Sequence, residues 1–181
     1  MDLFDIVQQL NDSALSQWLR TSLKALPIIN ALHVVALATV FGTIFLVDLR
    51  LLGYPDLRRS LSRLHHELVR WTWGAFGLAL VTGVLMFMVN AVTYHRNTAF
   101  WLKMAVIVVA GINMLVFERF TAKSMPSWDR GVLPPPAARL AGALSLVLWI
   151  SVIFLGRWIG FTKGYDFNIP IGVELPFTDP P

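Results

Sequence analysis

One uncharged apolar stretch limits what this chain can fold into. No charged residue lies between Pro27 and Val47, and Asp48 and Arg50 close the run abruptly before Leu52. About 20 apolar residues in a helix cross the ~30 Å hydrocarbon core of a bilayer, so residues 27–52 are predicted to form a membrane-spanning helix. The composition agrees, because only 14% of the chain is charged, against about 25% in soluble domains.

His33 is the unusual residue of this stretch. It lies about two turns in from the first end, inside the apolar run. An ionisable side chain at that depth is costly, so it is expected to face protein and to have a function. On a helical wheel His33 lies opposite Ala31, Ala38 and Gly42. Small residues let a second helix approach closely, so the wheel predicts a packing face of small residues and a separate face that presents the imidazole.

Three further apolar stretches are long enough to span a membrane, at residues 71–92, 100–117 and about 138–161. In the second stretch Ala75, Ala79 and Gly83 repeat every four residues, which predicts a helix-packing ridge. The short connection at 93–98 predicts antiparallel neighbours. The predicted fold class is therefore all-α, a bundle of four transmembrane helices.

The N-terminal segment differs from these spans. Residues 3–19 mix apolar and polar side chains with a break near 11–13, which is typical of an amphipathic helix on the membrane surface. It is not expected to be a secretory signal, because Asp2 and Asp5 replace the usual basic start. The chain thus divides into an amphipathic segment at 1–24, a four-helix domain at 25–161 and a proline-containing tail at 162–181. Pro27 is expected in the first turn of the first span.

Charge and cysteine content exclude several function classes. The formal net charge of +4 does not indicate nucleic-acid binding, because the basic residues lie at the ends of the spans. Nine of them fall in the first and third connections and six on the opposite side, so the positive-inside rule places both termini outside the bacterial inner (cytoplasmic) membrane. The absence of cysteine excludes disulfides, thiolate-ligated iron–sulfur clusters and covalent c-type haem.

With that topology, polar residues from four helices or helix ends meet near the outer leaflet: His33, Tyr94, His95, Lys103 and Arg157. Neutral imidazole is a common ligand of haem iron and copper, and cofactors in helix bundles are held by side chains from facing helices. His33 is the first candidate axial ligand of haem b, and His95 or Lys103 is the second, unless there is none. Arg157 would offset propionate charge.

Each of these residues also has a simpler interpretation. His33 alone could be a hydrogen-bonded helix-packing residue, and Lys103 and Arg157 could extend their charges to the outer head groups. His65 and His66 lie at the opposite level and are expected to be solvated. Copper handling, with His33, Met86 and Met88 as ligands, is an alternative function. A structural subunit without a cofactor is another.

Several motifs resemble those of an uncharacterised family of small bacterial four-helix membrane proteins. They are LHVVALATVFGTIFLVDLRLLG, the pair Thr82–Gly83, YHRNTAFWLK and GRWIGF. The resemblance runs from Trp18 to Phe161 with the motifs in the same order and spacing. It implies the four-helix fold and brings no activity with it.

A more distant resemblance is to the HemJ-type protoporphyrinogen oxidases and the CopD-type copper-resistance membrane domains. It rests on His33, the pair Phe41–Gly42, Arg50, and Lys103 in the sequence Trp-Leu-Lys. This resemblance implies haem b at His33 with Lys103 nearby, without implying porphyrinogen oxidation. The expected function is a haem b-binding membrane protein that transfers electrons between a membrane or periplasmic redox partner and the quinone pool. An oxidoreductase subunit is one form that such a protein could take.

Overall fold

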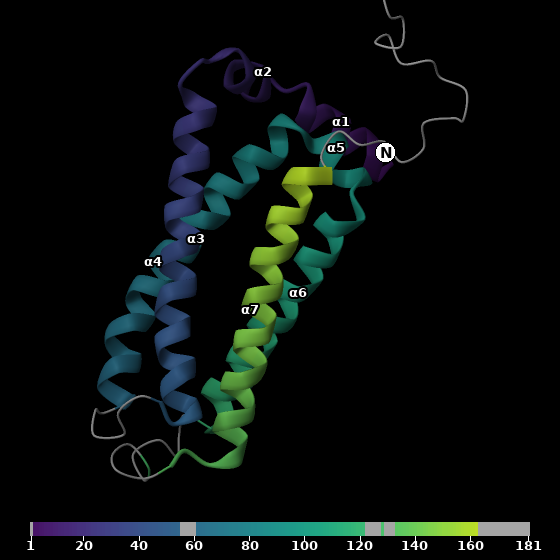
Figure 1. Cartoon of the computed structure of the whole chain (residues 1–181). Coiled ribbons are helices and arrows are strands. Elements are labelled where there is room, and N and C mark those ends of the chain that lie inside the picture. Colours follow the sequence, from purple (N-terminus) through teal and green to yellow (C-terminus); the bar gives the residue numbers. More distant parts are fainter. Residues whose placement is uncertain (1, 55–60, 122–127, 129–132, 163–181) are drawn as a thin grey trace, which may run out of the picture.

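Every regular element in the described part of the chain is helical. The computed structural model describes residues 2–54, 61–121, 128 and 133–162, and leaves aside the side chains of 61–66 and 121. The predicted tail at 162–181 lies outside it except for Thr162, as do the connection at 55–60 and most of 122–132. Four of the helices are long and apolar enough to cross a membrane. They are α3 (Ala25–Leu52), α4 (Leu61–Val89), α6 (Thr98–Val116) and α7 (Pro136–Thr162), shown in Figure 1.

The first span ends where the sequence predicted. Pro27 lies in the first turn of α3, where a missing N–H costs nothing. At the other end Gly53 adopts φ 97°, the one left-handed residue among those described. Its N–H donates to the Arg50 carbonyl at 3.1 Å, and the Tyr54 N–H donates to the Leu49 carbonyl at 2.9 Å. This glycine cap ends the helix directly after the charged pair.

The second span differs from the sequence prediction at both ends. Helix α4 begins at Leu61, within the basic connection, because a helix can continue past the apolar core into water. It ends at Val89, and residues Ala91–Arg96 form a separate short helix, α5. Asn97 then caps α6, its side-chain oxygen accepting from the Phe100 N–H at 3.2 Å. The connection predicted at 93–98 is therefore largely helical.

The amphipathic segment forms two helices, α1 (Leu3–Asn11) and α2 (Ala14–Thr21), with the predicted break between them. They lie against α5 and the adjoining ends of α3 and α4. Two side chains of α2 cap the C-terminal end of α4. The Ser16 hydroxyl donates to the Met88 carbonyl at 3.1 Å, and the Arg20 Nε donates to the Val89 carbonyl at 2.8 Å. These carbonyls have no partner within their own helix.

The four long helices are arranged as two pairs. Helix α3 packs along α4, helix α6 packs along α7, and the two pairs are joined through α3 and α7. Among the described residues, no Cα atom of α6 comes within 8 Å of α3 or α4. In Figure 1 helices α3 and α7 are close at the end that carries Gly53 and diverge toward the end that carries α5, where α4 crosses between them in this view. We refer to these as the Gly53 end and the α5 end.

The joint between the pairs is tightest at the Gly53 end. A Cβ added to Gly142 of α7 would lie 3.0 Å from the Leu51 Cβ and 3.2 Å from the Asp48 carbonyl. Leu51 also belongs to a buried cluster with Phe117, Trp128 and Ala138. The absence of a side chain at Gly142 is what lets α3 and α7 approach this closely.

The two faces predicted for α3 are reversed. Ala36 and Val40, next to His33 on the wheel, are 2% and 1% exposed, whereas Ala31 and Ala38 are exposed. A Cβ at Gly42 would meet no atom within 4 Å. The prediction of a small-residue packing face was wrong, because lipid accepts alanine and glycine as readily as a helix does. The polar His33 has to find partners within the protein, and its face is the packed one.

Candidate functional site

His33 makes a hydrogen bond across the α3–α4 interface. Its Nδ1 lies 2.8 Å from the Thr82 Oγ1. The Thr82 hydroxyl has a single proton, and its oxygen lies 2.7 Å from the Leu78 carbonyl and 3.2 Å from the Ala79 carbonyl, both of which can only accept. With that proton donated to a carbonyl, Thr82 accepts from His33, and the Nδ1 atom carries the ring proton. In the neutral imidazole this leaves the Nε2 lone pair available as a ligand or hydrogen-bond acceptor.

A glycine makes room for the His33 ring. A Cβ added to Gly83 would lie 3.2 Å from the His33 Cε1 atom, which is tighter than ordinary packing. Ala79, one turn earlier, is 7% exposed. The predicted ridge of Ala75, Ala79 and Gly83 thus faces α3, and its packing role is confirmed. Part of that role is to accommodate the histidine.

Lys103 is the candidate residue that the structure brings toward His33. It lies in the second turn of α6, half-buried, and its charge acts on the His33 imidazole. Its Nζ lies 3.7 Å from where a Cβ would stand on Gly156 of α7. His33 of α3 therefore lies against a glycine of α4, and Lys103 of α6 lies against a glycine of α7.

His95 and Tyr94 belong to an aromatic cluster at the α5 end. The His95 ring lies edge-on to Trp101, with 5.7 Å between centroids, and the Trp101 Nε1 donates to the His95 carbonyl at 2.8 Å. The Tyr94 ring lies 5.6 Å from the Phe100 ring. Both residues therefore pack against the start of α6.

Arg157 lies near the end of α7 with its guanidinium 4.8 Å above the Phe161 ring, and it is exposed. That placement fits a charge extended toward head groups as well as it fits a propionate partner. The side chains of His65 and His66, predicted to be solvated, lie outside the described part of the chain.

The residues of the copper alternative lie on the α3–α4 pair, His33 on α3 and the two methionines on α4. Among the side chains that the structure describes, no three His, Asp or Glu residues lie together in a way that could hold a metal ion. Met86 and Met88 are half-buried on α4. A haem iron, in contrast, takes most of its ligands from the porphyrin and needs only one or two from the protein.

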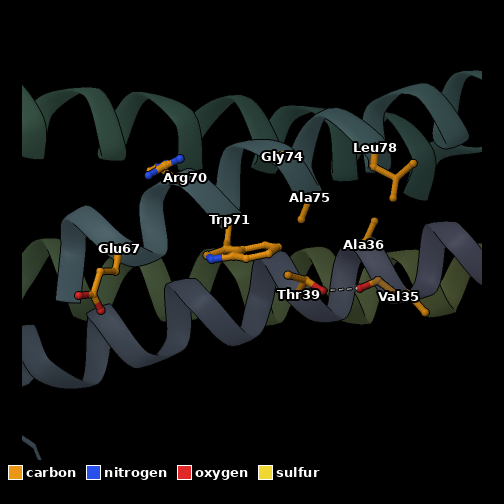
Figure 2. A pocket seen from close by; sticks show the side chains of 9 residues that line it. All are labelled: Val35, Ala36, Thr39, Glu67, Arg70, Trp71, Gly74, Ala75 and Leu78. Atoms are coloured by element: carbon orange, nitrogen blue, oxygen red, sulfur yellow. Dashed lines mark hydrogen bonds between the residues drawn. The ribbon is translucent and has the colours of Figure 1, made fainter. Parts of the chain in front are cut away.

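A separate groove of about 870 Å³ lies between α3 and α4. Figure 2 shows its lining, with the indole of Trp71 extending from α4 toward Thr39 on α3 and with Glu67 and Arg70 nearer one end. Apart from these two charged residues the lining is mostly apolar. His33 is not part of it, so the groove is distinct from the candidate site, and its exposed apolar wall faces the bilayer.

Two polar partners were not anticipated from the sequence. One is Thr82, whose hydroxyl fixes the His33 tautomer. The other is Ser145, whose side chain hydrogen-bonds to Asp48 across the α3–α7 joint. A hydroxyl inside an apolar span is a weak signal, because it can always hydrogen-bond to its own helix. Only the pairing of helices identifies which hydroxyls meet an ionisable group.

Comparison with known proteins gives one match. A family model described as "Family of unknown function (DUF6644)" matches residues 25–162, which covers all four spans. No curated protein and no solved structure matches the chain. The matched region leaves out α1 and α2, so the family is defined by the four-helix domain.

Proposed function

We propose that this chain, which belongs to the family of unknown function that matches residues 25–162, binds haem b through His33 and transfers electrons within the membrane. The observation that carries the proposal is the hydrogen bond from His33 Nδ1 to Thr82. A metal-ligating histidine usually donates its other ring N–H to an oxygen, which sets the tautomer and the ring orientation. In the protein alone, Nδ1 of His33 is already paired with an oxygen in this way.

The residues around His33 fit the cofactor. Nε2 of His33 would bind the haem iron, and Lys103 is a better candidate than His95 for a second ligand, because the His95 ring packs against Trp101. Lys103 alternatively offsets the charge of a propionate, a role that Arg157 and Tyr94 share in this proposal. Haem b, when bound, supplies a one-electron carrier whose potential the protein tunes.

The arrangement of the helix pairs also supports the proposal. Helix α6 does not pack against α3 or α4 in the described residues, yet the charge of its Lys103 acts on His33. Lys103 and Gly156 border the same region from the second pair. The distant resemblance to HemJ-type proteins, through His33 and Lys103, is consistent with this assignment.

The remaining parts of the proposal concern setting and partners. The site lies in the half of the bundle toward the α5 end, and we propose from the distribution of basic residues that this end lies at the outer leaflet of a bacterial inner membrane. The electron donor or acceptor would be a membrane or periplasmic redox protein on that side. The quinone pool, dissolved in the bilayer that the exposed apolar helices contact, would be the other partner.

A visible spectrum tests the proposal. Protein expressed with ample haem and purified gently should show a Soret band and a reduced-minus-oxidised spectrum typical of haem b. His33→Ala should lose most of the bound haem while its circular dichroism stays helical, because the iron loses its ligand from the protein. His95→Ala is the matched control and should keep the haem.

The same sample separates the alternatives. If the wild-type protein shows no Soret band, the haem proposal is wrong. Copper content measured on that sample then distinguishes copper handling from a structural subunit without a cofactor. Equal haem retention in His33→Ala and wild type would move the ligand to another residue.

A further inference from the structure

A second polar site lies at the Gly53 end of the bundle, away from His33. Asp48 of α3 is 4% exposed, although it lies only about one turn, ~6 Å, from the last residue of the helix. Its carboxyl group hydrogen-bonds to the Ser145 side chain of α7. Its Oδ2 atom is buried and has no hydrogen-bond partner. Both features distinguish it from the usual aspartate at the end of a span, which faces water.

The surroundings of Asp48 are apolar on the side of α7. Gly142 is packed against its backbone carbonyl, and Val47 and Ala141 pack on the neighbouring buried cluster. The influences on the carboxyl group are burial and the Ser145 hydroxyl. Arg50 follows two residues later, about 200° around the helix, and so faces a different side.

The other described charged residues at this end lie on α4, where Glu67 and Arg70 are exposed, on α7, and on the short helical segment Phe117–Thr121 that follows α6. Arg119 and Arg139 are exposed, and Glu118 is half-buried. None of these five is among the groups that act on Asp48. Among the described groups Asp48 therefore has no counter-charge, and an ionised carboxylate with one unpaired oxygen is far more costly to bury than a neutral carboxylic acid.

We propose that Asp48 and Ser145 form a proton-binding site, in which Asp48 is a neutral carboxylic acid in the folded protein at neutral pH. The neutral acid has an O–H group that can donate to the Ser145 oxygen, and its second oxygen is then an uncharged carbonyl, whose burial is tolerable. The proton comes from water at the Gly53 end, and no electron is transferred. Ionisable residues inside membrane spans commonly serve such proton exchange.

This site does not depend on haem at His33. The two lie on opposite halves of α3, about 15 residues apart, which is ~22 Å of helix. The proposal can therefore be correct in a protein that binds no cofactor, and it can fail in one that does.

Infrared spectroscopy of the purified full-length protein in nanodiscs tests it. At neutral pH the wild type should show the C=O stretching band of a protonated carboxylic acid. That band should move when aspartate alone carries ¹³C in its carboxyl group, and it should disappear in Asp48→Asn. Glu67→Gln removes an exposed carboxylate of α4 and is the matched control, which should keep the band. In heavy water the band should shift, because the proton exchanges.

Ser145→Ala gives a second test that leaves the carboxyl group in place. Loss of the hydrogen bond should move the Asp48 band to higher frequency without removing it. This variant and the labelled wild type decide the question even if Asp48→Asn does not fold. A wild-type spectrum with no band that responds to the aspartate label would overturn the proposal. A band that persists unchanged in folded Asp48→Asn, or that Ser145→Ala does not move, would do the same.

Discussion

The Nδ1 atom of His33 lies 2.8 Å from the hydroxyl oxygen of Thr82, and that hydroxyl is committed as a donor to the carbonyl of Leu78. The imidazole is therefore held by a group that can only accept from it. This relationship links two helices, α3 and α4, and also sets which ring nitrogen is available to a ligand.

The first prediction concerns Thr82. Thr82→Val keeps the shape of the side chain but leaves the His33 N–H without its acceptor. We expect a loss of about 1–3 kcal/mol in the free energy of unfolding and roughly a 10–100-fold loss of haem affinity. Haem titration and thermal unfolding in detergent measure the two effects. Thr82→Ser keeps the hydroxyl and should behave like the wild type. If the valine variant binds haem as tightly as the wild type, the hydrogen bond from His33 to Thr82 does not contribute to haem affinity.

The second prediction compares two glycines. Gly83→Ala places a Cβ 3.2 Å from the His33 ring, whereas Gly156→Ala places one 3.7 Å from the Lys103 Nζ. The first contact is too tight without movement of the imidazole, and the second is ordinary packing. Gly83→Ala should weaken haem binding and stability, Gly83→Leu should do so more strongly, and Gly156→Ala should be tolerated. Equal behaviour of the two alanine variants would show that the His33 ring has room to move.

The third prediction concerns the charge of Lys103. Its ammonium acts on His33, and a nearby positive charge disfavours the oxidised, more positive form of a haem. In the role of a propionate partner Lys103 is an ammonium, so Lys103→Leu, which removes the charge without offering a ligand, should lower the midpoint potential, while Lys103→Arg, which keeps the charge, should change it less. Redox titration followed in the visible spectrum measures both. An increase in potential in the leucine variant would contradict this account of its role.

The fourth prediction concerns the joint between the helix pairs. Gly142→Ala forces a Cβ to within 3.0 Å of Leu51 and 3.2 Å of the Asp48 carbonyl, and overpacking of this kind costs about 1–3 kcal/mol. Gly160→Ala lies in the same helix, where a Cβ meets nothing within 4 Å. Because alanine favours helix over glycine, this control should be neutral or slightly stabilising. Thermal unfolding in detergent compares the two variants. Equal stability would contradict the close packing of α3 against α7 at Gly142.

The fifth prediction concerns orientation. The chain has no cysteine, so single cysteines can be introduced without a background. Thr93→Cys at the exposed side of α5 should react with an impermeant thiol reagent in intact cells. Tyr54→Cys, at a residue that is 69% exposed at the opposite end, should react only after the membrane is opened. The reverse pattern would place the termini inside.

The elements were largely predictable from the sequence, because membrane spans are set by length and hydropathy alone. The four spans, the position of Pro27 in the first turn and the break near Asp12 follow from local signals. So does the ridge that ends at Gly83, whose four-residue repeat fixes one side of the helix.

The faces and partners were not predictable in the same way. In water the polar side of a helix marks its exposed face, but in lipid both sides are apolar. The helical wheel therefore placed Ala31 and Ala38 correctly on one face of α3, but we predicted that this face packs against a helix, whereas it is exposed. Asp48 was interpreted as the end of a span because charges usually mark that boundary, and only the approach of α7 buries it. The partnership of His33 with Thr82 likewise depends on the register between two helices.

The contacts of α2 with the end of α4 have a consequence for the order in which the protein is made. Ser16 and Arg20 donate to Met88 and Val89, residues 72 and 69 positions later in the chain. When the ribosome has finished α1 and α2, their partners do not yet exist. The two short helices have to wait, and their exposed apolar residues, such as Leu3, Phe4 and Trp18, suit them to the membrane surface meanwhile. They can dock only after the first two spans have been inserted, so a segment that is synthesised before these spans reaches its final place after them.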